Sequence, residues 1–394
     1  MPDSHFRLRS LALAAVLLGG AVAAPTQAPP AGGAATTQPS AALRARLQAV
    51  LDSAHRTGRA PGTSVGIALG DGTTLALTSG LADTALRRPL VPTDKLLQGS
   101  VGKTYVAAVA LQLVHEGKLR LDDSIERYLG SEPWFSRLAN ARGITIRNLM
   151  NHTSGVVRYE FKPEFTRDLT AQPMKAWRPE EQIAYLLDDP APFAPGAGWE
   201  YSDTNYILLG MIIERVTGSR YYDELQRRLL TPLGLRNTVP SDSRRIPGLA
   251  QGYAGPRNQF GGADAMVSNG EFAINPQFEW TGGGIASTPE DLARWGKALY
   301  EGRAFDPSLL PQALDGVPAR LGANVRYGLG VMVRPTTLGT TYGHSGFFPG
   351  YLTEMMYFPD MRTAIAVQVN SSTAGSGFPN RVLLALAQAI ASSR

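Results

Sequence analysis

The sequence predicts an α+β fold in which one antiparallel sheet is flanked by N- and C-terminal helices and a mainly helical region is inserted in its middle. Three observations predict this fold. Strand-like segments gather in two stretches far apart in the chain, at about 41–99 and 280–394. The stretch between them, about 100–279, has mostly helical periodicity. The chain has 394 residues, of which 43% are hydrophobic, so 41–394 is long and apolar enough to form a domain with a sizeable core.

The N-terminal segment has the pattern of an export signal. The first ten residues carry two arginines, and an apolar run at 11–24 contains the small residues Ala-Val-Ala. This pattern predicts a signal peptide, residues 1–23, cleaved after Ala23. A membrane anchor would need roughly 18 or more apolar residues, whereas this run is shorter and two glycines interrupt it. Residues 24–40 are expected to be a flexible linker, and the mature protein to be periplasmic or secreted, with no stable membrane anchor.

The first elements of the predicted domain are a helix and a hairpin. Leucines recur at helical spacing over 41–57, which predicts an amphipathic helix that packs on the domain. Two strand-like segments, 63–70 and 73–80, then flank Asp71-Gly72, the two-residue turn signal of a β-hairpin.

The last elements return to the sheet. Between Ser100 and about Gly218 the pattern is mostly helical, with long Pro-rich loops. Residues 340–347, 351–358 and 363–370 then predict three strands of an antiparallel meander. A final helix is expected at 381–391.

The composition excludes several classes of function. The formal net charge is +5, and the basic residues are scattered rather than gathered in a run, which argues against nucleic acid as a partner. The sequence contains no Cys, which excludes a disulfide, a thiol nucleophile and a thiolate metal site.

Three short motifs match known signatures but lack their context. Residues 62–66 match the G-x-S-x-G nucleophile elbow, yet strand-like residues follow the serine where that motif requires a helix. Residues 343–346 read G-H-S-G, but Phe347 replaces the closing Gly and no His follows in the chain. Residues 102–104 read G-K-T, but Leu97 stands where a phosphate-binding loop has its first Gly, which disfavours nucleotide binding.

A fourth motif, S-x-x-K at Ser100 and Lys103, fits a nucleophile and its proton partner. Two residues three apart on a helix share a face, so the lysine amine can reach the serine hydroxyl. The pair lies at the end of a loop, just before the apolar helix predicted at 104–117. Ser100 would then lie at the helix N-terminus, where the helix dipole favours negative charge on the serine. A desolvated lysine can act as a base because burial lowers its pKa. The motif alone is short and not specific.

Longer segments around this motif carry a resemblance to a known family. The segments are LLQGSVGK (96–103), ITIRNLMNHTSG (144–155), FAPGAGWEYSDTNYILLGMIIERVTG (193–218), LLTPLGLRNT (229–238), TGGGIASTPEDLARW (281–295) and YGHSGFFPGY (342–351). In this order they resemble the serine β-lactamase and DD-peptidase superfamily, in the branch that holds class C β-lactamases, D-alanyl-D-alanine carboxypeptidases, D-aminopeptidases and related esterases. The resemblance runs from about 62 to 370 and implies a β-lactamase/transpeptidase-like fold.

The resemblance also implies roles for the motif residues. Ser100 would be the acyl-accepting nucleophile and Lys103 its proton partner. Tyr201 matches the Tyr of the family's Y-x-N motif, whose phenol shuttles a proton between nucleophile and leaving group. The backbone N–H groups of Ser100 and Phe347 would form the oxyanion hole.

The second motif departs from the family at Asp203, where Asn is usual. A carboxylate there would keep Lys103 charged and move the task of the base toward Tyr201. It would also favour a substrate that bears a free amine. The alternative is that Asp203 merely caps the helix predicted at 204–216.

The third motif, K-T-G or H-x-G in the family, corresponds to His344, Ser345 and Gly346, and the resemblance implies that these residues bind substrate. An imidazole is only partly charged at neutral pH, so it would attract the carboxylate of a β-lactam less than lysine does. His152, in the turn-forming N-H-T-S-G, is expected to be structural.

These inferences predict an exported serine hydrolase that forms an acyl-enzyme on Ser100, without metal or organic cofactor. The leading expectation is a DD-carboxypeptidase-like activity on D-amino acid amides or esters of peptidoglycan type. A short-acyl esterase and a weak β-lactamase are enzymatic alternatives, and a catalytically inactive module that binds penicillin or wall fragments is a non-enzymatic one. The expected partner is a small-molecule or peptidoglycan-derived substrate, and the protein is expected to be a monomer.

Overall fold

The computed structural model describes residues 40–256, 258, 264–375 and 377–393. The predicted signal peptide and all but the last residue of the predicted linker lie outside these ranges. Within them, no helix combines the length and the apolar character that crossing a membrane requires.

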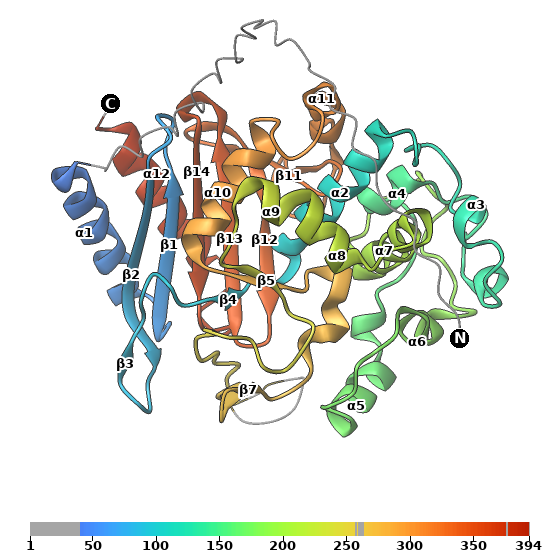
Figure 1. Cartoon of the computed structure of the whole chain (residues 1–394), viewed down its shortest axis with the longest axis horizontal. Coiled ribbons are helices and arrows are strands. Elements are labelled where there is room, and N and C mark those ends of the chain that lie inside the picture. Colours follow the sequence, from blue (N-terminus) through green and yellow to red (C-terminus); the bar gives the residue numbers. More distant parts are fainter. Residues whose placement is uncertain (1–39, 257, 259–263, 376, 394) are drawn as a thin grey trace, which may run out of the picture. The chain divides into compact units, whose positions relative to one another are not determined.

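The main sheet joins the early and late parts of the chain. It is antiparallel throughout, with the strand order β3-β2-β1-β14-β13-β12-β11-β10-β9 (Figure 1). The strands are β1 (Gly62–Ala68), β2 (Thr74–Asp83), β3 (Arg88–Pro89), β9 (Val317–Pro318), β10 (Arg326–Tyr327), β11 (Met332–Thr336), β12 (Gly339–Phe348), β13 (Tyr351–Phe358) and β14 (Thr363–Val369). The predicted hairpin is β1–β2 and the predicted meander is β12–β14, so both are confirmed. At the seam between β1 and β14, Thr63 pairs with Val369.

Helices cover both faces of this sheet. Helices α1 (Ala41–Thr57) and α12 (Phe378–Ala391) pack together on one face, over the apolar side chains of β1 such as Val65. Gly66 points to the other face, where a Cβ would lie 1.8 Å from the carbonyl oxygen at the start of α10 (Pro289–Tyr300). The glycine of the G-x-S-x-G match is therefore explained by close packing of α10 on the sheet.

The inserted region supplies most of the remaining helices and one of the three short strands that form a second, smaller sheet. Its helices are α2 (Lys103–His115), α3 (Glu126–Leu129), α4 (Ile146–Met150), α5 (Pro163–Ala171), α6 (Pro179–Ile183), α7 (Asp203–Thr217), α8 (Tyr221–Leu225) and α9 (Thr231–Leu233), and α11 (Leu310–Leu314) follows later. The short strands are β4 (Leu96–Leu97), β5 (Thr238–Pro240) and β8 (Ile285–Ser287), and a separate two-stranded ribbon is formed by β6 (Val267–Ser268) and β7 (Glu271–Phe272). Ten of the thirteen residues of α2 are buried, as expected of a helix that is covered on all sides.

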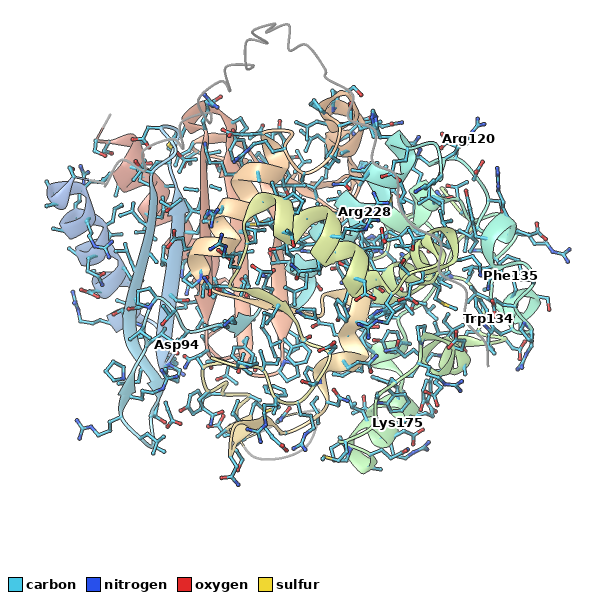
Figure 2. All side chains as sticks on the ribbon, viewed as in Figure 1. Asp94, Arg120, Trp134, Phe135, Lys175 and Arg228 are labelled. Carbon is cyan, nitrogen blue, oxygen red and sulfur yellow. The ribbon has the colours of Figure 1, made fainter. Side chains whose placement is uncertain are left out.

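A buried ion-pair network fixes the C-terminal end of α2. Arg228 lies in the π-helical turn η5 (Gln226–Leu230) that follows α8 (Figure 2). Only 5% of its side chain is exposed. It pairs with Glu224 at 2.5 Å and with Glu116, the residue just after α2. The central helix is thereby tied to its neighbours at the end opposite Ser100.

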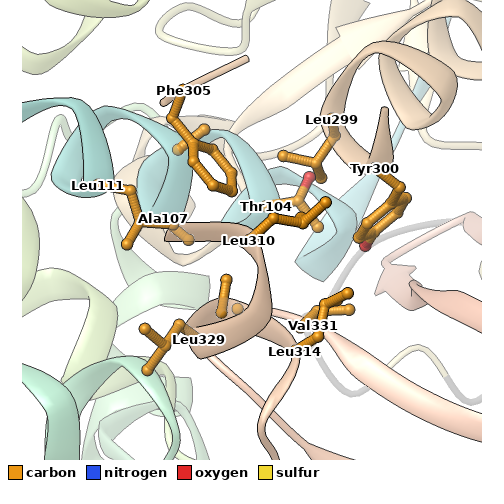
Figure 3. Close-up of a pocket in the computed structure, with 13 residues that line it drawn as sticks. Thr104, Ala107, Leu111, Leu299, Tyr300, Phe305, Leu310, Leu314, Leu329 and Val331 are labelled. Atoms are coloured by element: carbon orange, nitrogen blue, oxygen red, sulfur yellow. The ribbon is translucent and has the colours of Figure 1, made fainter. Parts of the chain in front are cut away.

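A small apolar cavity lies beside α2 (Figure 3). Thr104 and Leu111 of α2 and Leu299 of α10 contribute to its wall. Its volume of about 10 Å³ is close to the minimum that one water molecule needs, so it is a packing gap and not a ligand site.

Candidate active site

The predicted nucleophile lies in a tight turn that leads into α2. Ser100 belongs to the 3₁₀ turn η1 (Gly99–Gly102), and Lys103 is the first residue of α2. The Lys103 side chain is completely buried, and its Nζ donates a hydrogen bond to Ser100 Oγ at 2.9 Å. The S-x-x-K spacing thus places the Lys103 ammonium within hydrogen-bond distance of the Ser100 hydroxyl, as the helical geometry predicts.

Two glycines let other backbone segments approach this turn. A Cβ on Gly346 of β12 would lie 1.9 Å from the carbonyl oxygen of Gln98. A Cβ on Gly102 would lie 2.5 Å from the carbonyl oxygen of Gly283. The backbone of the turn is therefore in close contact with the backbone near Gly346 and near Gly283. In the segment that contains Gly283, the carbonyl oxygen of Gly282 accepts a hydrogen bond of 2.5 Å from Lys103 Nζ.

The two residues of the expected oxyanion hole lie together. Gly99, beside Ser100, has φ +54°, and a Cβ there would come within 2.7 Å of the backbone nitrogen of Phe347. Ser100 and Phe347 line the same cleft.

Tyr201 lies between two cations. The ring centre is 5.0 Å from Lys103 Nζ and 5.3 Å from the guanidinium carbon of Arg158. The imidazole of His152 packs behind it with ring centres 4.1 Å apart, and His152 Nδ1 accepts a hydrogen bond from the backbone of the neighbouring Ser202 at 3.3 Å. Burial raises the pKa of the Tyr201 phenol, while Lys103 acts in the opposite direction.

Asp203 is an ion-pair residue and not a cap. It is the first residue of α7, and the residue in the N-cap position is Ser202. Its carboxylate pairs with Lys103 on one side and with Arg158 at 3.2 Å on the other. The expectation that it merely caps the helix is therefore wrong, because two buried or half-buried cations already use its oxygens.

The pair of Lys103 and Asp203 is ionised. Burial alone lowers the pKa of Lys103, but Asp203 and Tyr201 outweigh burial and hold that pKa above its ordinary value. Burial alone raises the pKa of Asp203, but Lys103, Glu160 and Arg158 outweigh it and hold that pKa below its ordinary value. Lys103 thus stays an ammonium, as the Asp203 substitution led us to expect.

Two buried carboxyl groups near this pair have no signal in the sequence. Glu160 accepts a hydrogen bond from Arg158 at 2.5 Å, and burial, then the charge of Asp203, raises its pKa well above the ordinary value. Burial raises the pKa of Glu279 to about 8, although Lys103 acts in the opposite direction. In the described ranges, no group of three or more His, Asp and Glu side chains is placed to hold a metal ion.

Within the third motif, His344 is placed differently from expectation, whereas Ser345 and Gly346 line the cleft. The His344 side chain is fully buried; its Nδ1 donates to the carbonyl oxygen of Ser345 at 2.6 Å, and its Nε2 accepts from the hydroxyl of Tyr327 at 2.8 Å. Burial, then the charge of Lys103, lowers the pKa of His344 to about 3, so the imidazole is neutral. The structure corrects the expectation of a partly charged imidazole that meets substrate, since Ser345, Gly346 and Phe347 line the cleft and His344 faces inward.

The cleft in front of Ser100 has a volume of about 1080 Å³. On its floor, Arg334 pairs with Glu354 and donates to Ser345 Oγ at 2.8 Å, and Ser345 donates to Glu354 at 2.9 Å. The apolar part of its wall includes Leu321, Val325, Met332, Phe347, Leu352, Met356 and Leu384. The cleft is large enough for an organic substrate and offers it both polar and apolar surfaces.

Comparisons with known proteins agree with this architecture. The family model described as "Beta-lactamase" matches residues 43–389. Penicillin-binding protein 4* of Bacillus subtilis is 27% identical over 73% of this chain, but the match spans only 63% of that relative's length. Esterase EstB of Burkholderia gladioli is 29% identical, with 89% of this chain and 96% of the esterase covered. Among solved structures, a D-stereospecific amidohydrolase from Streptomyces sp. aligns with a TM-score of 0.74 and 29% identity over 86% of this chain and 98% of that one.

Proposed function

Because the chain belongs to the beta-lactamase family of serine hydrolases, we propose that it hydrolyses small amides or esters through an acyl-enzyme on Ser100. The observation that carries the proposal is the hydrogen bond of 2.9 Å from Lys103 to Ser100 Oγ, at the wall of a cleft that Tyr201 also lines. A nucleophile, a fixed cation and a proton carrier thus meet where a substrate can enter.

In the proposed acylation, Ser100 Oγ attacks the substrate carbonyl and gives its proton to the phenolate form of Tyr201. The backbone N–H groups of Ser100 and Phe347 stabilise the oxyanion of the tetrahedral intermediate. When the intermediate collapses, Tyr201 returns the proton to the leaving group. Lys103 stays protonated throughout; it orients Ser100 Oγ and stabilises the phenolate.

Deacylation repeats the same steps with water as the nucleophile. Tyr201 takes a proton from the attacking water, and Ser100 leaves as an alkoxide that regains its proton from Tyr201. The cycle therefore balances with no metal or organic cofactor.

Amides or esters of D-amino acids of the peptidoglycan type are the substrates that we propose first, in a DD-carboxypeptidase-like reaction. The similar proteins support this class, since they include a penicillin-binding protein and a D-stereospecific amidohydrolase. Weak β-lactam hydrolysis fits the neutral, inward-facing His344, because the strand offers no cation at that position to a β-lactam carboxylate.

A short-acyl esterase is the second candidate. The residues Phe347 and Leu321 are 47% and 40% exposed, and both line the cleft. Exposed apolar side chains next to a nucleophile suit an apolar acyl group, and the relative from Burkholderia gladioli is an esterase.

Export is a separate part of the proposal, and it has its own test. Cleavage after Ala23 predicts that the protein recovered from the periplasm or the medium begins at Ala24. Intact-mass measurement of that material checks this prediction, and a chain that still carries residues 1–23 would contradict it.

Labelling of the serine tests the acyl-enzyme directly. We expect a fluorophosphonate to add one group per chain to the wild type and none to Ser100→Ala, as read by intact-mass spectrometry. The matched control is Ser64→Ala, which removes the completely buried serine of the G-x-S-x-G match and should label like the wild type. A penicillin is expected to leave a long-lived adduct on Ser100. Labelling of Ser100→Ala at the wild-type level would overturn the proposal and leave a binding module as the alternative.

A further inference from the structure

Arg158 presents its charge to the cleft beside Tyr201. It precedes the 3₁₀ turn η3 (Tyr159–Phe161), and its side chain is 25% exposed. The guanidinium lies 4.1 Å from the ring centre of Phe161 and 5.3 Å from that of Tyr201, so two aromatic rings orient its plane. Arg158, Tyr201 and Ser100 line the same cleft.

The carboxyl partners of Arg158 lie on its inner side. The hydrogen bonds that described residues make to the guanidinium use Nε, toward Glu160 at 2.5 Å, and Nη2, toward Asp203 at 3.2 Å. Neither Glu160 nor Asp203 lines the cleft. Asp203 is shared with Lys103, and burial raises the pKa of Glu160 and so favours its uncharged form. Lys103 and Arg158 thus share Asp203, and Arg158 is the one of these two cations that lines the cleft, with its Nη1 outside the two hydrogen bonds.

The other charged side chains of the cleft neutralise each other. Among the described residues that line it, Arg158, Arg334 and Glu354 carry charge. Arg334 pairs with Glu354 and also donates to Ser345. Arg158 is therefore the cleft cation whose carboxylate partners both lie outside the lining, so no carboxylate in the cleft lining pairs with it.

We infer that Arg158 determines specificity by binding a carboxylate on the leaving group of the substrate. The inference rests on the proposed function, in which Tyr201 protonates the leaving group, because the guanidinium that stacks on Tyr201 then lies on the leaving-group side of Ser100. The substrate class is an amide or ester of an amino, hydroxy or mercapto acid whose carboxylate is free. A planar guanidinium suits a carboxylate because it can donate parallel hydrogen bonds to both oxygens.

A matched pair of thioesters tests the inference. The two substrates share one N-acyl-D-alanyl group; the leaving group is mercaptoacetate in one and its methyl ester in the other, and thiol release is followed. We expect the wild type to prefer the charged substrate, with a ratio of kcat/KM values of about 10–100, as charge-assisted hydrogen bonds imply. The preference should fall as salt is added, since ions screen an exposed charge pair.

Two variants separate recognition from structure. Arg158→Gln should bring the ratio of kcat/KM values for the charged and the neutral thioester close to one. Arg158→Lys should keep part of the preference for the charged thioester. The ratio is the decisive readout, because any shift in the Tyr201 pKa or any loosening of the site affects both thioesters alike. Arg220→Gln, which removes an exposed arginine that does not line the cleft, is the control that should preserve the ratio.

The outcomes also separate this inference from the proposed function. A wild type without a preference, or Arg158→Gln with the preference intact, would overturn the role of Arg158 while fluorophosphonate labelling of Ser100 still supports the acyl-enzyme. Absence of labelling at Ser100 would overturn both.

Discussion

At position 203, a carboxylate in place of an amide determines the charge of the lysine behind the nucleophile. Asp203 holds Lys103 as an ammonium, and a lysine that is already protonated cannot take the serine proton. In the proposed mechanism Tyr201 therefore takes the serine proton, and the two cations near its ring, Lys103 and Arg158, stabilise its phenolate. Under this mechanism, a single residue difference at position 203 moves the role of the base from Lys103 to Tyr201.

Asp203→Asn is expected to move the pH dependence of the reaction to lower pH. Asp203 raises the pKa values of both Tyr201 and Lys103, so removing its charge lowers both. The ascending limb of kcat/KM follows deprotonation of Tyr201 and the descending limb follows deprotonation of Lys103. Both limbs should shift down, by about 1–3 pH units for a charge this close.

A pH profile of kcat/KM with a neutral ester measures this shift. Asp223→Asn, which removes an exposed carboxylate paired with Arg220, is the matched control and should leave the profile in place. An unchanged or upward-shifted profile in Asp203→Asn would contradict the assignment of Tyr201 as base.

Local motifs revealed part of the site, and the rest depends on packing. Ser100, Lys103 and Tyr201 stand in segments whose short spacings are visible in the sequence. Arg158 and Glu160 lie in a segment without periodicity or motif, and they reach the site only because that segment folds over the start of α7. The burial that decides their charges is a property of the folded chain.

At the scale of elements, β12 packs against the nucleophile turn without room for a side chain at Gly346. Gly346→Ala would bring a Cβ to 1.9 Å from the Gln98 carbonyl oxygen. Either β12 or the turn that carries Ser100 must therefore move in this variant. We expect a loss of about 1–3 kcal/mol in stability, typical of overpacking, and a larger loss of acylation rate because the turn carries Ser100. Thermal unfolding and fluorophosphonate labelling kinetics measure the two effects.

Gly143→Ala is the control for this substitution. The nearest atom to its Cβ would be a Pro195 side-chain carbon at 3.4 Å, an ordinary contact. Labelling by Gly346→Ala at the rate of Gly143→Ala would show that β12 does not constrain the turn.

The ion-pair network at the end of α2 should support the fold measurably. Arg228→Met leaves the buried Glu224 without its buried partner, which typically costs about 3–5 kcal/mol. Arg227→Met removes a cation that is 63% exposed from the same Glu224 and should cost at most about 1 kcal/mol. Urea unfolding at pH 7 compares the variants, and equal losses would contradict the argument from burial.

The same network has a pH signature. The hydrogen bond from Arg228 lowers the pKa of Glu116 to about 2 from 4.5. A lowered folded-state pKa stabilises the fold above pH 4.5, and this contribution is lost as the pH falls toward 2. The stability difference between wild type and Arg228→Met should therefore shrink between pH 5 and 2.

Elements with a long, regular pattern were predictable, and very short ones were not. The strands of the β1–β2 hairpin and the β12–β14 meander have clear turn signals or alternation. Strands β4 and β5 span only two or three residues, too few for a period to show, and they form by pairing with β8. Helix α12 begins at Phe378, three residues before the expected start, since Pro379 is tolerated in a first helical turn.

For the whole molecule, α12 is expected to be essential. Its buried side chains Phe378, Val382, Leu383, Leu386 and Ile390 cover the sheet face that α1 shares. At about 1.5–3 kcal/mol each, their burial approaches the entire stability of a typical domain, about 5–15 kcal/mol. A chain that ends at residue 376 should not fold, as judged by soluble yield and circular dichroism. The control is a chain that ends at residue 391, which loses only residues beyond α12; it should fold, and a fluorophosphonate should label its Ser100. Equal soluble yield and equal circular dichroism of the two shortened chains would contradict this prediction.

The seam between β1 and β14 also sets the order in which activity can arise during synthesis. The ribosome makes β1 early, but one of its two partner strands, β14, follows only after the inserted region and β9–β13. A nascent chain therefore holds Ser100 in a turn that has neither β12 beside it nor a closed sheet behind it. The proposed hydrolysis can therefore begin only once β12–β14 have been made. Until then the sheet cannot close, so the chain can still pass unfolded through a translocation channel, as the proposed export requires.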